Sequence, residues 1–141
     1  MVTSPGAGPG ATADQVVHPD DVHPEASRRH LSDVRPWGRF DQYSQNEPTT
    51  VKVITVEPGH RLSLQRHARR SEYWIVLDGP MEITVGQRSW MAAAGERIWI
   101  PVGALHRMAN PGPGRGRVLE LAYGDFDEDD IERVEDDYAR R

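Results

Sequence analysis

The chain has 141 residues, which is enough for one domain of ordinary size with a single hydrophobic core. Its formal net charge of −5 argues against a nucleic-acid partner, and the absence of cysteine excludes disulfide bonds and thiolate metal sites. No apolar run approaches the length of a membrane helix, and the N-terminus lacks the pattern of a signal peptide. We therefore expect a cytoplasmic protein that makes no membrane contact.

The first part of the chain is rich in glycine, proline, alanine and aspartate and shows no sustained apolar periodicity. A segment of this composition buries too little apolar surface to offset the entropy that it loses on ordering. We predict a flexible N-terminal arm over residues 1–32, followed by one domain over residues 33–141.

From Arg35 onward, short β-branched and aromatic runs alternate with turn residues. Most of these runs end at a proline, glycine or aspartate, which are residues that favour turns. Many short strands at close spacing are typical of an antiparallel sandwich or barrel. The predicted strands cover residues 51–56, 73–77, 81–85, 97–100 and 117–121.

The C-terminal stretch from Asp127 to Tyr138 has a different periodicity. Ile131, Val134 and Tyr138 stand at positions i, i+3 and i+7, which lie on one narrow face of a helix. Acidic residues at the start of this stretch and arginines after it suit the two ends of a helix dipole. The sequence therefore predicts a short C-terminal helix.

Two segments concentrate the side chains that can bind a metal ion. In the first, Gln65 and His67 are separated by one residue, so on a strand both point to the same face. Glu72 lies an odd number of residues beyond both, so a turn or bulge over residues 68–71 must return it to that face. In the second segment, proline and glycine force turns, and His106 comes from a neighbouring strand.

Two imidazoles, one carboxylate and one amide oxygen form a suitable ligand set for a divalent metal ion. We expect Zn²⁺, with Mn²⁺, Fe²⁺, Co²⁺ or Ni²⁺ as alternatives. A single histidine on a strand is more often a packed residue than a ligand. The metal site is favoured here because two half-motifs, each bounded by glycines, occur in a chain that already has the pattern of a β-barrel.

These half-motifs resemble the paired motifs of the cupin superfamily. The surrounding residues are similar to one branch, the type II mannose-6-phosphate isomerases, whose isomerase domain is often fused to a mannose-1-phosphate guanylyltransferase. The match begins at Arg35-Pro36-Trp37-Gly38, ends at Asp136/Asp137-Tyr138, and includes Lys52, Leu62-Ser63-Leu64-Gln65, Glu72-Tyr73-Trp74-Ile75-Val76 and His106-Arg107. The resemblance implies an all-β cupin double-stranded β-helix, a jelly-roll barrel, with Gln65, His67, Glu72 and His106 as the metal ligands.

The resemblance also implies aldose–ketose isomerisation of a sugar phosphate, in which the metal polarises the oxygens at C1 and C2 and stabilises an enediolate. It makes Lys52 and Arg107 the candidate catalytic residues. The candidate substrate contacts are Arg70, Tyr73 and Ala122. The ordinary interpretation of each arginine is an exposed salt-bridge partner. Lys52 stands out because it is the only lysine and lies on a predicted barrel strand.

Several positions depart from the family's pattern. Ala68 and Arg69 stand where the family usually continues a run of histidines, Tyr73 replaces a histidine, and Ala122 replaces a glutamine that faces the pocket. The metal ligands match the family's motif, whereas the residues that would contact the substrate differ from it. This pattern is typical of a relative that has the same fold and metal site but acts on a different substrate. No Gly-rich nucleotide-binding loop precedes the cupin pattern, so we expect no guanylyltransferase activity.

Two other functions stay open. The first is another cupin enzyme of a biosynthetic pathway, such as a dioxygenase or a different isomerase or epimerase; Gln65 argues modestly against oxygen chemistry, which usually favours three histidines around Fe²⁺. The second is a non-catalytic cupin that binds a sugar or another metabolite. The apolar outer faces, with Trp37, Trp74, Trp90 and Trp99, exceed what one small barrel can bury, although the ordinary interpretation of each tryptophan is a buried core residue. The resemblance to cupins implies a homodimer through a sheet face.

Overall fold

The computed structural model describes residue 25 and residues 29–138. These residues form two compact units that divide between Glu47 and Pro48. The flexible arm predicted for residues 1–32 therefore falls mostly outside the part of the chain that the structure describes. No helix in the described ranges is long and apolar enough to cross a membrane.

The first unit contains an antiparallel hairpin, formed by β1 (Leu31–Arg35) and β2 (Gly38–Gln42). The two strands are in register from the pair Leu31–Gln42 to the pair Arg35–Gly38. Gly38 has a φ of 141°, a backbone conformation that a residue with a Cβ atom rarely adopts, so glycine suits the tight turn at this point.

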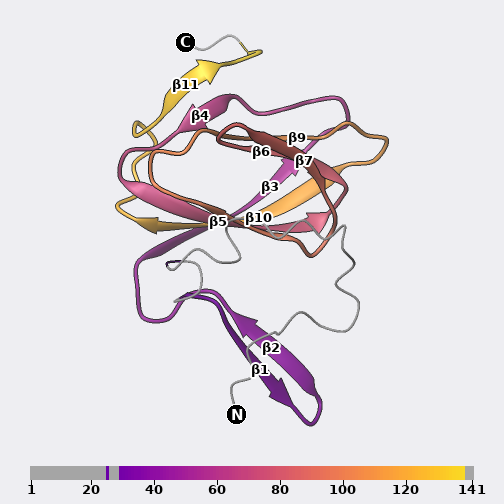
Figure 1. Cartoon of the computed structure of the whole chain (residues 1–141), viewed down its shortest axis with the longest axis vertical. Helices are drawn as coiled ribbons and strands as arrows, with labels where there is room; N and C mark the ends of the chain where they lie inside the picture. Colours follow the sequence, from indigo (N-terminus) through magenta and orange to yellow (C-terminus); the bar gives the residue numbers. More distant parts are fainter. Residues whose placement is uncertain (1–24, 26–28, 139–141) are drawn as a thin grey trace. The chain divides into compact units, whose positions relative to one another are not determined.

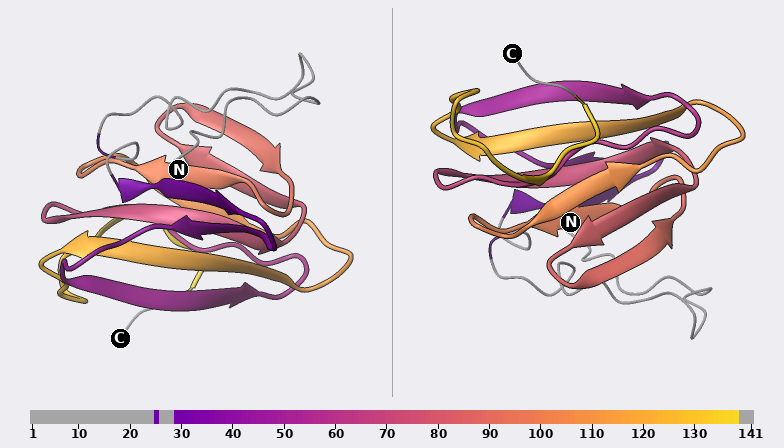
Figure 2. Two further views of the ribbon diagram at one scale, coloured as in Figure 1. Left: turned by 90° about the horizontal axis from the view of Figure 1, so that it is seen from below. Right: turned by 90° about the horizontal axis from the view of Figure 1, so that it is seen from above.

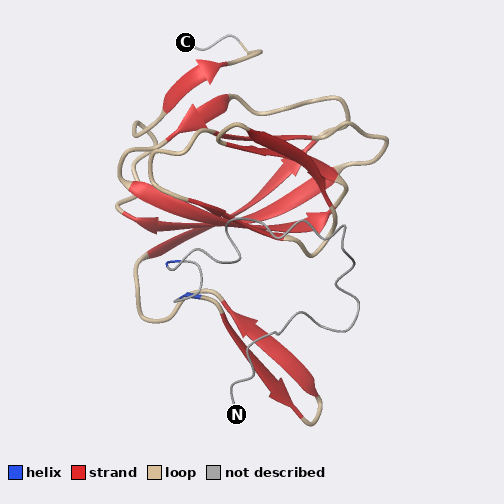
Figure 3. Ribbon diagram, in the orientation of Figure 1, coloured by secondary structure: helices blue, strands red, loops and turns tan. Residues whose placement is uncertain are grey.

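The second unit is built from strands joined by loops (Figure 3). One sheet has the strand order β3-β10-β5-β8, and the other has the order β11-β4-β9-β6-β7 (Figures 1 and 2). Strands far apart in the sequence thus pair as neighbours, and the all-β jelly-roll barrel predicted from the sequence is confirmed. The strands are β3 (Thr49–Val56), β4 (Leu64–Arg66), β5 (Arg70–Asp78), β6 (Met81–Val85), β7 (Arg88–Ala92), β8 (Arg97–Ile100), β9 (His106–Ala109), β10 (Gly116–Gly124) and β11 (Glu132–Glu135).

The interior between the two sheets is apolar at one end and polar at the other. Alternate residues of each strand point inward, and at the apolar end they form a closely packed core that excludes water. Toward the other end of the same strands the inward residues become polar, as in β10, where Val118 is followed by Glu120. The core contains Val56, Trp74, Val76, Met81, Ile83, Ala92, Ile98, Ile100, Met108 and Val118.

The predicted C-terminal helix is wrong. Residues 127–131 form turns, in which the amide of Asp130 donates to the carbonyl of Asp127 at 3.0 Å, and the chain continues as β11, paired with β4. The carboxylate of Asp130 accepts hydrogen bonds from the amides of Ala68 and Arg69 instead of capping a helix. The apolar residues that suggested a helix do not pack into a core: Val134, on β11, and Tyr138 are both exposed.

Candidate metal centre

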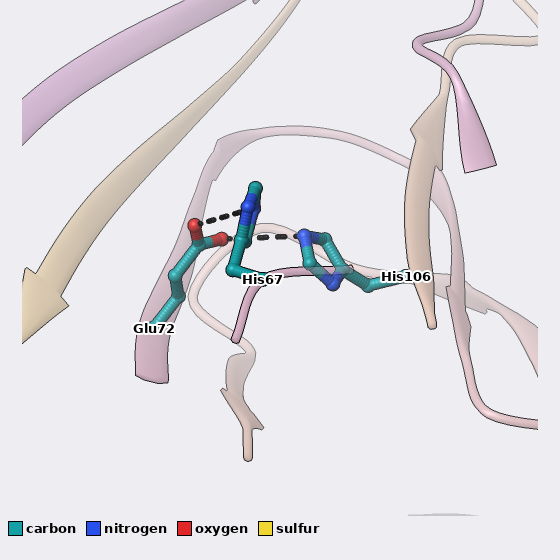
Figure 4. Close-up of side chains that lie close together, drawn as sticks. All are labelled: His67, Glu72 and His106. Atoms are coloured by element: carbon teal, nitrogen blue, oxygen red, sulfur yellow. Dashed lines mark ion pairs between the residues drawn. The ribbon is translucent and has the colours of Figure 1, made fainter. Parts of the chain in front are cut away.

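Three buried side chains converge at the polar end of the barrel (Figure 4). His67 follows β4, Glu72 lies on β5 and His106 begins β9. Each carboxylate oxygen of Glu72 lies near one imidazole ring: Oε2 is 3.2 Å from Nε2 of His67, and Oε1 is 3.6 Å from Nε2 of His106. One ligand atom from each residue lies within 4.8 Å of the other two, so the three residues can hold a metal ion.

Backbone carbonyls fix the orientation of both imidazole rings. Nδ1 of His67 is 2.7 Å from the carbonyl oxygen of Asp130, and Nδ1 of His106 is 2.9 Å from that of Ala104. A carbonyl oxygen only accepts hydrogen bonds, so each Nδ1 carries a proton and leaves Nε2 as the ring atom available to the other site residues. The Nε2 atoms of both rings are directed toward Glu72, while each Nδ1 donates to a backbone carbonyl, which is the outer contact that metal-ligating histidines make.

His106 shows that this group suits a metal ion. Its Nε2 atom is buried and has no hydrogen-bond partner. Burial lowers the pKa of His106, so the ring is neutral at pH 7 and the lone pair of Nε2 is free to bind. A buried polar atom without a partner destabilises the fold. Two imidazoles and a carboxylate form a donor set that matches a divalent transition-metal ion, so the residues present fit one.

Glu72 is held as a carboxylate in spite of its burial. Burial by itself raises its pKa, but the hydrogen bond to His67 and the nearby His106 ring hold the pKa of Glu72 well below its usual range. Trp74 Nε1 donates to Oε1 at 3.0 Å, and Arg70 Nε donates to Oε2 at 3.2 Å. The carboxylate is therefore ionised and rigidly placed, as a metal ligand must be.

Arg70 belongs to the same cluster. Its guanidinium is buried, and besides its bond to Glu72 its Nη2 atom lies 3.3 Å from Nε2 of His67. Its Nη1 atom donates to the carbonyl oxygen of Asp127 at 3.0 Å. The side chain predicted as a substrate contact therefore lies in the candidate site, where it places a positive charge beside Glu72.

Gln65, the predicted fourth ligand, lies on β4 directly opposite His106 on β9. Directly opposed residues of paired strands point to the same face, so both side chains belong to the inner face of the sheet. Gln65 is half-buried, and its Oε1 atom accepts a hydrogen bond from Ser63 Oγ at 3.3 Å. The role of Gln65 as a ligand stays a prediction.

Two further predicted site residues also face the interior of the barrel. Ala122 is buried on β10 opposite Glu72 on β5. Lys52 on β3 pairs with Glu120, which in turn pairs with Trp74, so all three side chains project from the inner face of the sheet. The Nζ atom of Lys52 lies 3.0 Å from Oε1 of Glu128.

Tyr73 and Arg107 are not brought to the metal ligands. Tyr73 follows Glu72 on β5, and Arg107 follows His106 on β9. Because successive side chains of a strand point to opposite faces, both residues point away from the face that carries the ligands. Tyr73 packs edge-on against Trp99, with ring centroids 5.7 Å apart. Arg107 Nε donates to the carbonyl oxygen of Leu62 at 2.9 Å, and Nη1 lies 3.9 Å from Oε2 of Glu135.

Glu120 is the site residue that sequence reasoning missed. It is buried beside Glu72, and its Oε1 atom accepts a hydrogen bond from Trp74 Nε1 at 3.2 Å. Burial, followed by the charge and hydrogen bond of Glu72, raises the pKa of Glu120 to about 8. An acidic residue between Leu119 and Leu121, inside the predicted strand 117–121, was the available signal.

Replacing Glu120 by Gln should stabilise the metal-free protein in a pH-dependent way. The pKa of this carboxyl is higher in the folded state than the ordinary value of 4.5 for a glutamate, so its ionisation opposes folding increasingly as pH rises from 4.5 to 8. We expect Glu120→Gln to add on the order of a few kcal/mol to the free energy of unfolding at pH 9 and little at pH 4.5. Urea unfolding in EDTA at both pH values measures this, and an equal gain at both would contradict it.

The family comparison covers most of the chain. Residues 23–136 match the family model described as "Mannose-6-phosphate isomerase C-terminal". The alginate biosynthesis protein AlgA of Pseudomonas aeruginosa is 40% identical over 115 residues, which cover 81% of this chain and 24% of AlgA. Mannose-1-phosphate guanylyltransferase 2 of Escherichia coli O157:H7 is 44% identical over 110 residues, 77% of this chain and 23% of that protein. The chain thus spans about a quarter of the length of these relatives.

Solved structures with low sequence identity share the fold. The capsular polysaccharide assembling protein CapF from Staphylococcus aureus is 21% identical with a TM-score of 0.58, over 75% of this chain and 34% of CapF. A cupin 2 domain-containing protein from Halorhodospira halophila is 21% identical with a TM-score of 0.55, over 74% of this chain and 68% of that one. The chain therefore has the cupin fold, and it belongs to the family of the mannose-6-phosphate isomerase C-terminal domain.

Proposed function

We propose that this chain is a metal-dependent aldose–ketose isomerase that acts on a sugar phosphate, with mannose 6-phosphate as the first candidate. The observation that carries this proposal is the buried group of His67, Glu72 and His106, which is preorganised for a metal ion in a domain of this family. The two relatives reported above are named for alginate biosynthesis and for mannose-1-phosphate guanylyltransferase, which supports a small phosphorylated sugar as the ligand.

The proposed ligands are His67, Glu72 and His106, with Gln65 as the fourth and Zn²⁺ as the first metal to test. A bound divalent ion supplies the positive charge that polarises the carbonyl and hydroxyl oxygens of the sugar. The protein's own contribution is to hold two imidazoles and an ionised carboxylate in place before the substrate arrives, so that no reorganisation is needed during the reaction.

Of the inward-facing residues, Lys52 would orient the sugar phosphate. Lys52 offers an ammonium group to an anionic substituent, and it comes from a strand of the sheet that also carries Glu72. Ala122, buried opposite Glu72, offers no side-chain hydrogen bond to a sugar hydroxyl. The missing polar group at Ala122 favours a second candidate within the same reaction class, an isomerase or epimerase of another sugar phosphate.

Turnover of mannose 6-phosphate to fructose 6-phosphate by metal-loaded protein tests the proposal directly. We expect activity in the wild-type chain and a loss of at least about 100-fold in Glu72→Gln, because the metal contributes several kcal/mol of transition-state stabilisation. Oxygen uptake recorded in the same assay separates isomerisation from dioxygenase chemistry. Full metal occupancy without turnover in either direction would rule out this substrate.

The homodimer remains a proposal. Val51 and Val53 are exposed on β3, which is the edge strand of its sheet. An apolar edge of this kind is a favourable surface for pairing with a second copy of the chain.

A further inference from the structure

Two cations at the polar end of the barrel share one aromatic ring. Nζ of Lys52 lies 4.5 Å from the ring centroid of Phe126, and Cζ of Arg70 lies 4.3 Å from it. Phe126 belongs to the segment between β10 and β11, while Lys52 comes from β3 and Arg70 from β5. Through Phe126, this connecting segment therefore contacts inward-facing side chains of two strands, both in the sheet that carries Glu72.

Arg70 and Lys52 differ in how strongly other groups of the protein hold them. Arg70 is buried and already donates to Glu72 and to the carbonyl of Asp127. Lys52 is partly exposed, and the carboxylate that it meets is that of Glu128, whose side chain is 75% exposed. An ion pair between exposed side chains changes an equilibrium by less than about five-fold. Lys52 is thus the cation that can exchange its partner for a ligand.

The segment is held more tightly a few residues further on. The carboxylate of Asp130 is largely buried and accepts two backbone amide hydrogen bonds, from Ala68 and Arg69, both at 2.9 Å. The carbonyl of Asp130 also accepts from Nδ1 of His67. Asp130 is therefore an anchor next to the metal ligands, and the weak contact at Glu128 lets its side chain leave Lys52 without disturbing them.

Resting on the proposed function, we propose that Lys52 forms the subsite for the phosphate group of the ligand and that Glu128 is its internal competitor. The carboxylate of Glu128 occupies the ammonium group of Lys52 until a phosphate replaces it. A phosphate monoester carries up to two negative charges and three strong acceptor oxygens, so it pairs with an ammonium group more strongly than a single carboxylate does. Glu128 thus sets a threshold that favours dianionic ligands over monoanionic ones.

Binding measurements on the metal-loaded full chain test this subsite without relying on turnover. The probes are mannose 6-phosphate, inorganic phosphate and mannose, titrated in a calorimeter. Lys52→Gln should weaken mannose 6-phosphate binding by at least about 10-fold, because a charge-assisted hydrogen bond is lost, while Lys52→Arg should retain most of it. Mannose, which lacks the phosphate, should bind equally to all three proteins.

Glu128→Gln should tighten mannose 6-phosphate and inorganic phosphate binding by about 2- to 5-fold. Its matched control is Glu132→Gln, which removes the same charge from β11, where the carboxylate pairs with Arg66 instead. In the Lys52→Gln background, Glu128→Gln should have no effect. The proposal is overturned if Glu128→Gln acts no differently from Glu132→Gln, or if its effect persists without Lys52.

Failure of this inference is distinguishable from failure of the proposed function. Phosphate binding that depends on Lys52 and Glu128 without any turnover would keep the subsite and reject the isomerase. Turnover whose KM does not respond to Lys52→Gln or Glu128→Gln would keep the isomerase and reject the subsite. Metal content and the urea midpoint of each variant establish that the change in affinity is not caused by loss of the fold.

Discussion

Glu72→Gln should weaken divalent metal binding by more than about 100-fold. Loss of an outer partner of a metal ligand already costs about 10- to 100-fold, and this substitution removes the one anionic ligand itself. In wild-type protein, metal at 100 times its Kd should raise the free energy of unfolding by about 2.7 kcal/mol, and at the same concentration the variant should gain almost nothing. Calorimetric titration with Zn²⁺ gives the affinities, and urea unfolding with and without the metal gives the change in the free energy of unfolding that metal binding causes.

The matched control is Glu82→Gln, which removes the same charge from an exposed position on β6. It should bind the metal as the wild type does. If the affinity of Glu72→Gln fell by less than about three-fold, Glu72 could not be a ligand and the candidate site would have to be abandoned.

Arg70→Met should destabilise the metal-free protein by about 3–5 kcal/mol, because it leaves the buried carboxylate of Glu72 without its cation. Methionine fills a similar volume, so the loss reports charge more than packing. Urea unfolding in EDTA measures the change. At saturating metal the deficit should shrink, since a bound cation supplies positive charge beside the same carboxylate.

Arg69→Met provides the comparison, because Arg69 is the adjacent arginine but is half exposed and pairs with acidic groups at the surface. Exposed ion pairs contribute about 0–1 kcal/mol, so this variant should unfold close to the wild type, with or without metal. A loss as small for Arg70→Met as for Arg69→Met would show that the buried arginine does not support the ionised state of Glu72.

The barrel strands could be predicted where apolar runs end at a strong turn signal. The expected strands at 81–85 and 97–100 match β6 and β8. Strand β4 has only three residues, too few for an alternating pattern, so a strand there was indicated only by the spacing of Gln65 and His67. The helix expected after Asp127 failed because periodicity cannot reveal that the carboxylate of Asp130 binds the loop before β5.

The candidate site was predicted in part, and the errors follow from geometry. Spacing within a strand identifies residues that share a face, which is how the metal ligands could be recognised. The same alternation argues against Tyr73 and Arg107, the sequence neighbours of Glu72 and His106. Glu120 lies outside both half-motifs, and it reaches Glu72 only because β10 pairs with β5, a contact between segments far apart in the chain.

The origin of Glu72 and His106 in different sheets has a consequence for metal selectivity. The separation of the two sheets is set by the apolar side chains packed next to the ligands, and a close-packed interior transmits a change of volume across its width. Core residues such as Ile98 and Met108 therefore act as spacers that adjust the distance between ligands. Because metals differ in their preferred bond lengths and geometry, variation in this neighbouring layer can retune which ion is held while every ligand stays the same.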